Sequence, residues 1–391
     1  MNYRISQRAA SLSPSLTLAI DAKSKLMKAE GQDVVGFGAG EPDFDTPQHI
    51  KDAAAQALAA GFTKYTPSSG IPELRQAIAD KFRRENGLSY KPSQIIVSCG
   101  GKHSCYNVIL CTCQQGDEVI IPAPYWLSYP EMVKLAGAKP VILPTTDKTE
   151  FKVTPEQLRA ALTPNTRLFI LNSPSNPTGT VYTPEEIKAL GDICVEQGVL
   201  IMSDEIYEHL LYDGVKHKSV ASFSQAHYDH TIVVHGFAKA WSMTGWRLGF
   251  LAAPDPIAKA IDAIQSHSTS NPTSFAQKGA VAALTGPQDH LPQWLAEYDK
   301  RRAYAWKKLN SIAGLTCCNA KGAFYLFPNI SRTGLKSSDF CAKLLEAEKV
   351  AAVPGIAFGA DDYLRLSYAT SMANIEKGLE RLERFVRTLH K

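Results

Sequence analysis

Short apolar segments that alternate with helical patterns are the feature that most constrains the fold of this 391-residue chain. Such segments, rich in β-branched and aliphatic residues, recur at 95–98, 118–121, 167–171, 199–203, 231–235 and 248–252. Continuous apolar strands separated by helices are typical of a mostly parallel α/β sheet that is covered on both faces. Because ligands of such sheets bind at the carboxyl ends of the strands, we expect the functional site there.

The regions on either side of this alternation have a different pattern. Amphipathic helices are indicated at 15–29 and 371–389, a further helix at 338–348, and short strands at 323–327, 350–353 and 364–368. These elements predict a smaller α+β domain on which the N-terminal helix docks. We therefore expect a large domain over 48–284, inserted between the two parts (1–47 and 285–391) of a small domain, in keeping with the chain length.

Composition excludes several classes of protein. The net charge is +4, from 42 basic and 38 acidic residues, without a basic cluster that would suit nucleic acid. No apolar run reaches the length of a signal segment or a membrane span, so we expect a cytoplasmic protein without membrane contact. The eight cysteines form no paired Cys-x-x-Cys set, and we expect core thiols in a reducing compartment rather than a metal site.

Lys239 is the strongest candidate for chemistry. It lies in the segment 236–249, GFAKAWSMTGWRLG, which directly follows the strand predicted at 231–235. A lone lysine is usually a solvated surface charge, but among apolar flanks a buried ammonium is costly unless it is neutral or used covalently. Imine formation with an aldehyde cofactor would resolve this conflict.

This lysine segment resembles the signature of class I and II aminotransferases, the fold type I family of pyridoxal-phosphate enzymes, and the resemblance extends over nearly the whole chain. It implies a seven-stranded, mostly parallel sheet in the large domain. It also implies that Lys239 forms the aldimine with the cofactor and that Arg247 binds the cofactor phosphate. Some relatives carry serines just before the lysine; Gly236 and Ala238 stand here instead, which places more weight on the other phosphate contacts.

Two further motifs follow predicted strands. Asp204 and Tyr207 belong to SDEIYE (203–208), and Asn176 belongs to NSPSNPTG (172–179). Without the resemblance these would be a helix cap and an Asn-Pro turn. The resemblance assigns Asp204 to the pyridine nitrogen, where a carboxylate keeps the ring an electron sink. It assigns Tyr207 and Asn176 to the ring hydroxyl oxygen, with Asn176 also near the substrate.

A glycine pair marks a candidate phosphate site. In SCGGK (98–102) a strand meets a helix start, and backbone amides there can approach an anion. The resemblance places the phosphate at Gly101 and Lys102, and makes Trp126, in APYWLSYP (123–130), a platform that stacks on the ring and contacts the substrate. Tyr65, in TKYTP (63–67), resembles the tyrosine that reaches the phosphate of the neighbouring subunit, which implies a homodimer with shared active sites.

Substrate recognition requires a cation for the α-carboxylate. Arg365 lies in the apolar segment YLRLSY (363–368), where it needs an anionic partner, and matches the family segment that supplies this arginine. Gly40, in GAGEPDF (38–44), resembles the loop that closes over the same carboxylate. Lys102, with Ser15 and Thr17, resembles the residues that recognise the substrate side chain in the prokaryotic branch of aspartate aminotransferases, where the lysine helps to bind the distal carboxylate.

The resemblance therefore implies transfer of an amino group from L-aspartate to 2-oxoglutarate by a ping-pong mechanism, with Lys239, Asp204 and Tyr207 as catalytic residues and Lys239 as general base and acid. The alternatives are prephenate, aromatic amino acids or alanine as substrates, or a pyridoxal-phosphate lyase on the same scaffold. A non-enzymatic regulator would need a DNA-binding domain, for which the short N-terminal segment leaves no room.

Overall fold

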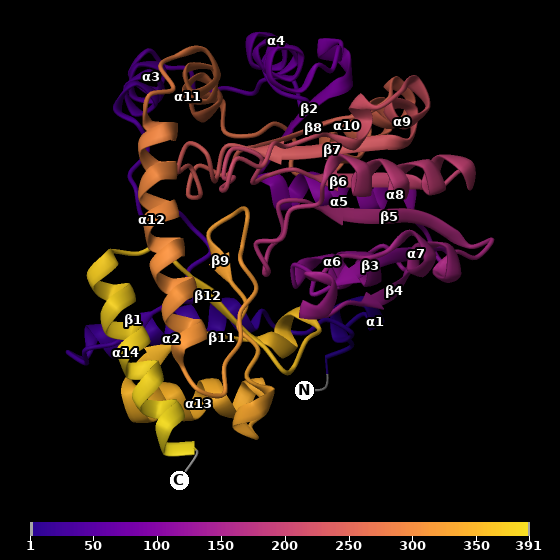
Figure 1. Cartoon of the computed structure of the whole chain (residues 1–391). Helices are drawn as coiled ribbons and strands as arrows, with labels where there is room; N and C mark the ends of the chain where they lie inside the picture. The colour runs from indigo at the N-terminus through magenta and orange to yellow at the C-terminus, as the bar shows by residue number, and fades with distance from the viewer. Residues whose placement is uncertain (1–2, 390–391) are drawn as a thin grey trace.

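A seven-stranded sheet forms the centre of the computed structural model, which describes residues 3–389 (Figure 1). Its spatial order is β2-β8-β7-β6-β5-β3-β4. Neighbouring strands from β7 to β4 pair in parallel, and β8 is antiparallel to both β7 and β2. The strands are β2 (Ile95–Ser98), β3 (Glu118–Ala123), β4 (Lys139–Pro144), β5 (Thr166–Asn172), β6 (Leu200–Asp204), β7 (Thr231–Gly236) and β8 (Gly249–Ala252). The predicted sheet is confirmed.

Strand β4 is the one member of this sheet that the apolar pattern did not reveal. Its sequence KPVILP carries prolines at both Pro140 and Pro144, and its side chains are largely accessible to solvent. Proline cannot donate a ladder hydrogen bond, so it is tolerated in a strand mainly at a sheet edge. The edge position of β4 agrees with this sequence, although a segment bounded by prolines does not by itself predict a strand.

Both faces of the sheet are buried, as the continuous apolar segments predicted. In β2, Ile96 packs in the cluster that includes Cys105 and Val108 of α5, whereas Ile95 and Val97 pack on the opposite face with Leu74 of α4. The helices are α1 (Gln7–Ala10), α2 (Leu16–Ala29), α3 (Gln48–Ala59), α4 (Pro72–Lys81), α5 (Gly101–Thr112), α6 (Ser128–Leu135), α7 (Pro155–Ala161), α8 (Pro184–Glu196), α9 (Gln225–His230), α10 (Asp255–Ser268), α11 (Ser274–Thr285), α12 (His290–Ser311), α13 (Ser337–Glu348) and α14 (Met372–Leu389). None of the helices in the described part of the chain is both long and apolar enough to cross a membrane.

Two small sheets lie beside the carboxyl ends of the large one (Figure 1). β1 (Val35–Gly36) pairs in parallel with β10 (Val350–Ala351), and β12 (Leu364–Ser367) lies between β11 (Val353–Pro354) and β9 (Tyr325–Leu326), antiparallel to both. The single strand expected at 350–353 is therefore two short strands in different sheets. Helix α2 contacts β1 and the C-terminal strands β10 and β11.

One hydrophobic cluster crosses from the large sheet to the small ones. It joins Tyr207, Leu210 and Tyr212, which follow β6, to Phe324 and the inner faces of α12, α13 and α14. Because this core is shared, the segment after β6 is held from both sides. The domain boundaries at 47/48 and 284/285 stay a prediction.

Candidate active site

A cavity of about 470 Å³ opens where strands β5, β6 and β7 end, facing β9 and β12. It brings together residues that are far apart in the sequence. The predicted residues that line it are Ser15, Thr17, Gly40, Gly101, Lys102, Trp126, Asn176, Asp204, Tyr207, Lys239, Arg247 and Arg365. Tyr65 does not line it; its side chain is 91% exposed. The sequence motifs thus converge on one site, with one exception.

Lys239 reaches into the cavity from the loop that follows β7. Its Nζ donates a hydrogen bond to the backbone oxygen of Gly40 and lies 5.6 Å from the centre of the Tyr207 ring and 5.5 Å from that of Phe324. Burial, reinforced by the positive charge of Arg365, lowers the pKa of Lys239 to about 8. A substantial neutral fraction near pH 8 makes this amine a competent nucleophile and base.

Asp204, the last residue of β6, is a buried carboxyl with two side-chain donors. The Tyr129 hydroxyl donates to its Oδ2 at 2.6 Å, and the Cys105 thiol lies 3.7 Å from the same oxygen. The Ile206 N–H donates to Oδ1 at 3.2 Å. Burial raises the pKa of Asp204, and the hydrogen bond from Tyr129 opposes this rise. Sequence reasoning missed Tyr129 and Cys105, because neither lies at a strand end and both roles depend on packing of α5 and α6.

Asn172 ties the end of β5 to the end of β6. Its side-chain amide donates to the backbone oxygen of Asp204 at 3.1 Å, and its Oδ1 accepts from the N–H of Asn176 at 2.9 Å. The two strands are in parallel register with Asn172 opposite Asp204. Consequently, the loop that carries Asn176 is fixed to the strand that carries Asp204.

Arg365 is the buried cation of the opposite wall, with 2% of its surface exposed. Its Nη2 donates to the backbone oxygen of Gly38 at 2.7 Å and its Nη1 to Oδ1 of Asn176 at 3.1 Å, while Nε is buried without a hydrogen-bond partner. The Tyr325 ring lies 4.6 Å from the guanidinium carbon, and the Tyr325 hydroxyl is 2.9 Å from that of Tyr207. Burial lowers the pKa of Arg365. A buried guanidinium without a carboxylate partner fits an anionic ligand.

The N-terminus of α5 forms a second anion site. Gly100 has φ +93°, and a Cβ there would lie 2.6 Å from Nη2 of Arg247; a Cβ on Gly249 would lie 2.2 Å from the N atom of Gly101. These glycines therefore let Arg247 and strand β8 approach the helix start. Lys102 Nζ lies 5.1 Å from the centre of the Trp126 ring, and burial together with the charge of Arg247 lowers the pKa of Lys102. Two cations at a helix N-terminus fit a phosphate.

The N-terminal segment closes one side of the cavity. Ser15 caps helix α2, accepting a hydrogen bond from Leu18 N–H at 3.4 Å, and Thr17 Oγ1 is buried without a partner. Glu41 also lines the cavity, where its Oε2 accepts from the Thr244 hydroxyl at 2.9 Å. The cations Lys25, Lys102, Lys239, Arg247 and Arg365 thus outnumber the acids Asp204 and Glu41 on these walls.

The donor set therefore fits pyridoxal phosphate, with an anion site at one end, an aromatic wall beside it, a carboxyl at the strand end and a lysine of lowered pKa. The fold and this cavity together define a pyridoxal-phosphate-dependent enzyme of the α/β class.

Comparison with known proteins specifies the family. The profile described as aminotransferase class I and II matches residues 32–382. The chain is 52% identical to the aspartate aminotransferase of Geobacillus stearothermophilus, covering 98% of this chain and 99% of that protein. It is 48% identical to the aspartate/prephenate aminotransferase of Nitrosomonas europaea, covering 97% and 98%. The solved structure of the Thermus thermophilus aspartate aminotransferase with maleate is similar at a TM-score of 0.93 and 44% identity, covering 98% of this chain and all of that one. This chain belongs to the class I and II aminotransferases.

Proposed function

We propose that this aminotransferase transfers the amino group of L-aspartate to 2-oxoglutarate and forms oxaloacetate and L-glutamate. The observation that carries the proposal is a second cation, Lys102, in the same cavity as Arg365. A dicarboxylic substrate needs two cationic sites, whereas alanine needs one. The names of the relatives support the same pair, as does the similar Thermus thermophilus structure with maleate, a four-carbon dicarboxylate.

Each end of the substrate has a proposed partner. Arg365, with its unpartnered Nε and the adjacent Asn176, binds the α-carboxylate under the Gly40 loop. Lys102 binds the distal carboxylate, and the Thr17 hydroxyl, buried without a partner, supplies a further donor beside Ser15. The spacing of the two cations then selects for chain length.

The cofactor is held by residues that fit its parts. Gly101, Lys102 and Arg247 bind the phosphate. Trp126 would stack on the ring, and Tyr207 and Asn176 would bind its hydroxyl oxygen. Asp204 would pair with the pyridine nitrogen, and the hydrogen bond from Tyr129 favours its carboxylate form against the effect of burial. When bound, pyridoxal phosphate supplies an electron-accepting ring that stabilises negative charge at the substrate α-carbon.

Lys239 moves the proton. With a pKa lowered to about 8, its amine would act as the base that takes the proton from the substrate α-carbon and as the acid that releases it, and the hydrogen bond to Gly40 fixes the position of Nζ. Because the amino group leaves one substrate before the second binds, we expect ping-pong kinetics. Steady-state lines that intersect would contradict this order.

The substrate assignment is tested by single half-reactions. The purified holoenzyme is mixed with one amino acid at a time, and the absorbance of the bound cofactor is followed. Aspartate and glutamate should convert it fastest, and Lys102→Ala should lose most of the preference for aspartate over alanine. The control Lys188→Ala removes an exposed lysine of α8 that pairs with Asp192. A Lys102→Ala enzyme with its preference intact would refute the assignment.

Prephenate is the second candidate substrate, because one relative at 48% identity is named for both activities. Prephenate is a 2-oxo acid with a second carboxylate, so the same two cations, Arg365 and Lys102, suit it as well. Rates measured with prephenate and with 2-oxoglutarate as the amino acceptor decide whether the enzyme transaminates 2-oxoglutarate alone or both oxo acids.

We further propose a cytoplasmic homodimer in which Tyr65 completes the phosphate site of the partner. All eight cysteines are free thiols, in keeping with a reducing compartment. Tyr65 is exposed and does not line its own cavity, which suits a role across an interface. If so, mixing Tyr65→Ala with Lys239→Ala chains creates one intact site per hybrid dimer, and activity rises above the sum of the two parents. No such rise would refute the shared site.

A further inference from the structure

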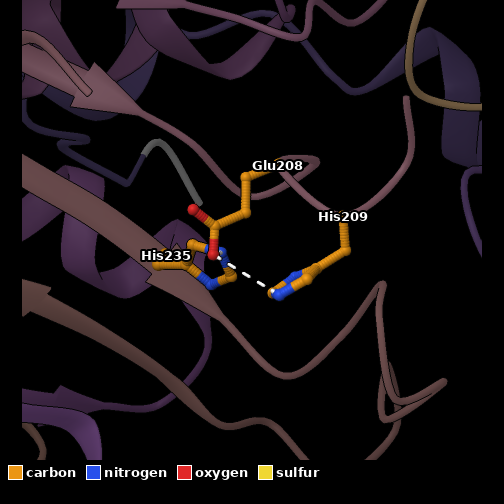
Figure 2. Close-up of side chains that lie close together, drawn as sticks. All are labelled: Glu208, His209 and His235. Carbon is orange, nitrogen blue, oxygen red and sulfur yellow. Dashed lines mark ion pairs between the residues drawn. The ribbon is translucent and has the colours of Figure 1, made fainter. Parts of the chain in front are cut away.

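A buried charged cluster lies behind the turn that carries Asp204 and Tyr207. These two residues line the cavity, whereas Glu205 and Glu208 of the same turn are buried away from it. Figure 2 shows the Glu208 carboxylate beside the rings of His235 and His209. We call Lys81, Asn86, Glu208, His209 and His235 the Glu208 cluster.

Glu208 connects three parts of the chain. Its Oε1 accepts from Nζ of Lys81, at the end of α4, and lies 3.0 Å from Nε2 of His235, in β7. Its Oε2 accepts from the side-chain amide of Asn86 at 2.8 Å. Although burial disfavours the carboxylate, the Lys81 ammonium lowers the pKa of Glu208 well below its usual value. The charge is therefore a permanent feature of the folded protein.

One acid and two histidines around a common point could suggest a metal site. Here Lys81 already supplies the cation. Its side chain is fully buried, with Nζ bonded to Glu208 and, at 2.9 Å, to Oδ1 of Asn86. A metal ion beside that ammonium would meet a like charge at close range. The cluster is an internal ion pair with histidine partners.

His235 links Glu208 to the end of strand β7, which precedes Lys239. The N–H of Gly236 donates to its Nδ1 at 2.7 Å, so Nδ1 is the acceptor, and Nε2 lies 3.0 Å from Oε1 of Glu208. Burial lowers the pKa of His235, which favours this neutral form. The ring stacks on Phe250 of β8 at 5.1 Å. β7 ends at Gly236, three residues before Lys239.

We propose that Glu208 is a positioning residue for transamination: by binding Lys81 and meeting His235, it fixes the Asp204–Tyr207 turn relative to Lys239. The turn presents Asp204 and Tyr207 to the cavity only while its back is held. Because catalytic groups must be held within about 0.5 Å of their productive placement, a loosened turn costs rate even in a folded protein.

The test uses the double variant Lys81→Met/Glu208→Gln, which removes both charges and leaves neither buried alone. With the amino acid that reacts fastest with the unmodified holoenzyme, so that the result does not depend on the aspartate assignment, kcat should fall about tenfold or more with little change in KM. In the apoenzyme, amide hydrogen exchange over residues 203–210 should accelerate. The control Lys308→Met/Glu383→Gln breaks a 2.5 Å ion pair between α12 and α14, which supply no residue to the cavity, and should change neither quantity.

Unchanged kcat and unchanged exchange in the double variant would overturn the proposal and leave the cluster a purely structural ion pair. If the double variant fails to fold, Glu208→Asp replaces it, because it keeps the charge and shortens the side chain by one methylene. If folded Glu208→Asp has a lowered kcat that saturating substrate does not restore, the result supports positioning. An unaltered kcat refutes the proposal.

Discussion

Tyr129→Phe is the substitution that most directly tests how far the Tyr129 hydrogen bond favours the ionised form of Asp204. The Tyr129 hydroxyl donates a 2.6 Å hydrogen bond to Oδ2 of this buried carboxyl. A hydrogen bond to a charged group is worth about 1.5 to 3 kcal/mol. At about 1.4 kcal/mol per tenfold, its loss shifts the ionisation of Asp204 by about 10- to 150-fold toward the protonated form. Burial already raises the pKa of Asp204, so the variant raises it further.

The assay is the pH dependence of the half-reaction rate with one amino acid. Because the rate requires the Asp204 carboxylate, the acid limb of the profile should move to higher pH in Tyr129→Phe, and the rate in alkaline solution should be less affected. The control Tyr182→Phe removes a buried hydroxyl that accepts from the N–H of Val153 at 2.9 Å, outside the cavity, and should lose stability without moving the acid limb. An acid limb that stays in place in Tyr129→Phe would refute the reasoning.

Three further outcomes follow from the same geometry. Arg365→Lys replaces the planar guanidinium with a single ammonium, so the KM for every amino acid should rise by about ten- to a hundredfold. Saturation of the half-reaction measures this change, and a rise for only some amino acids would contradict α-carboxylate binding. Gly100→Ala strains a residue at φ +93° and places Cβ 2.6 Å from Arg247, so the dissociation constant of pyridoxal phosphate, measured by titration of the apoenzyme, should rise. In the folded apoenzyme, burial lowers the pKa of Lys239 from 10.5 to about 8. Between pH 8 and pH 10.5 the unfolded chain therefore binds more protons than the folded chain, and the free energy of unfolding increases with pH. Lys239→Met should lack this increase in denaturant titrations at pH 8 and pH 10, and an identical pH dependence would refute the lowered pKa.

Several parts of the site could be predicted from the sequence because they lie at strand ends. Asp204 closes β6, Asn176 lies four residues beyond the end of β5, and Lys239 follows β7 by three residues. Parallel strands deliver their carboxyl ends to one edge, so a motif placed after a strand is placed in the site. Arg365 needed another argument, namely that a cation in an apolar strand requires an anion.

Other parts depended on how distant segments pack. Tyr129 and Asp204 are 75 residues apart, Tyr207 and Tyr325 are 118 apart, and Lys81 and Glu208 are 127 apart, yet each pair is in contact. No local pattern marks these partners: Tyr129 belongs to an ordinary helix, and Lys81 ends an amphipathic one whose charge would normally be solvated. The division of 350–353 between two sheets could likewise not be predicted, because the sequence of an apolar strand does not indicate which strand it pairs with.

The sequence by itself therefore determined the α/β architecture, the resemblance to the family and the candidate residues that line the cavity, since periodicity and strand-end motifs are local properties of the chain. Only the tertiary structure decided the state of those residues. The lowered pKa of Lys239, the Tyr129 hydrogen bond that opposes the raised pKa of Asp204 and the Glu208 cluster behind the turn all arise from burial and from pairing across the fold. Burial and charge pairing depend on which distant side chains exclude water from a group, and that is settled only when the segments pack together.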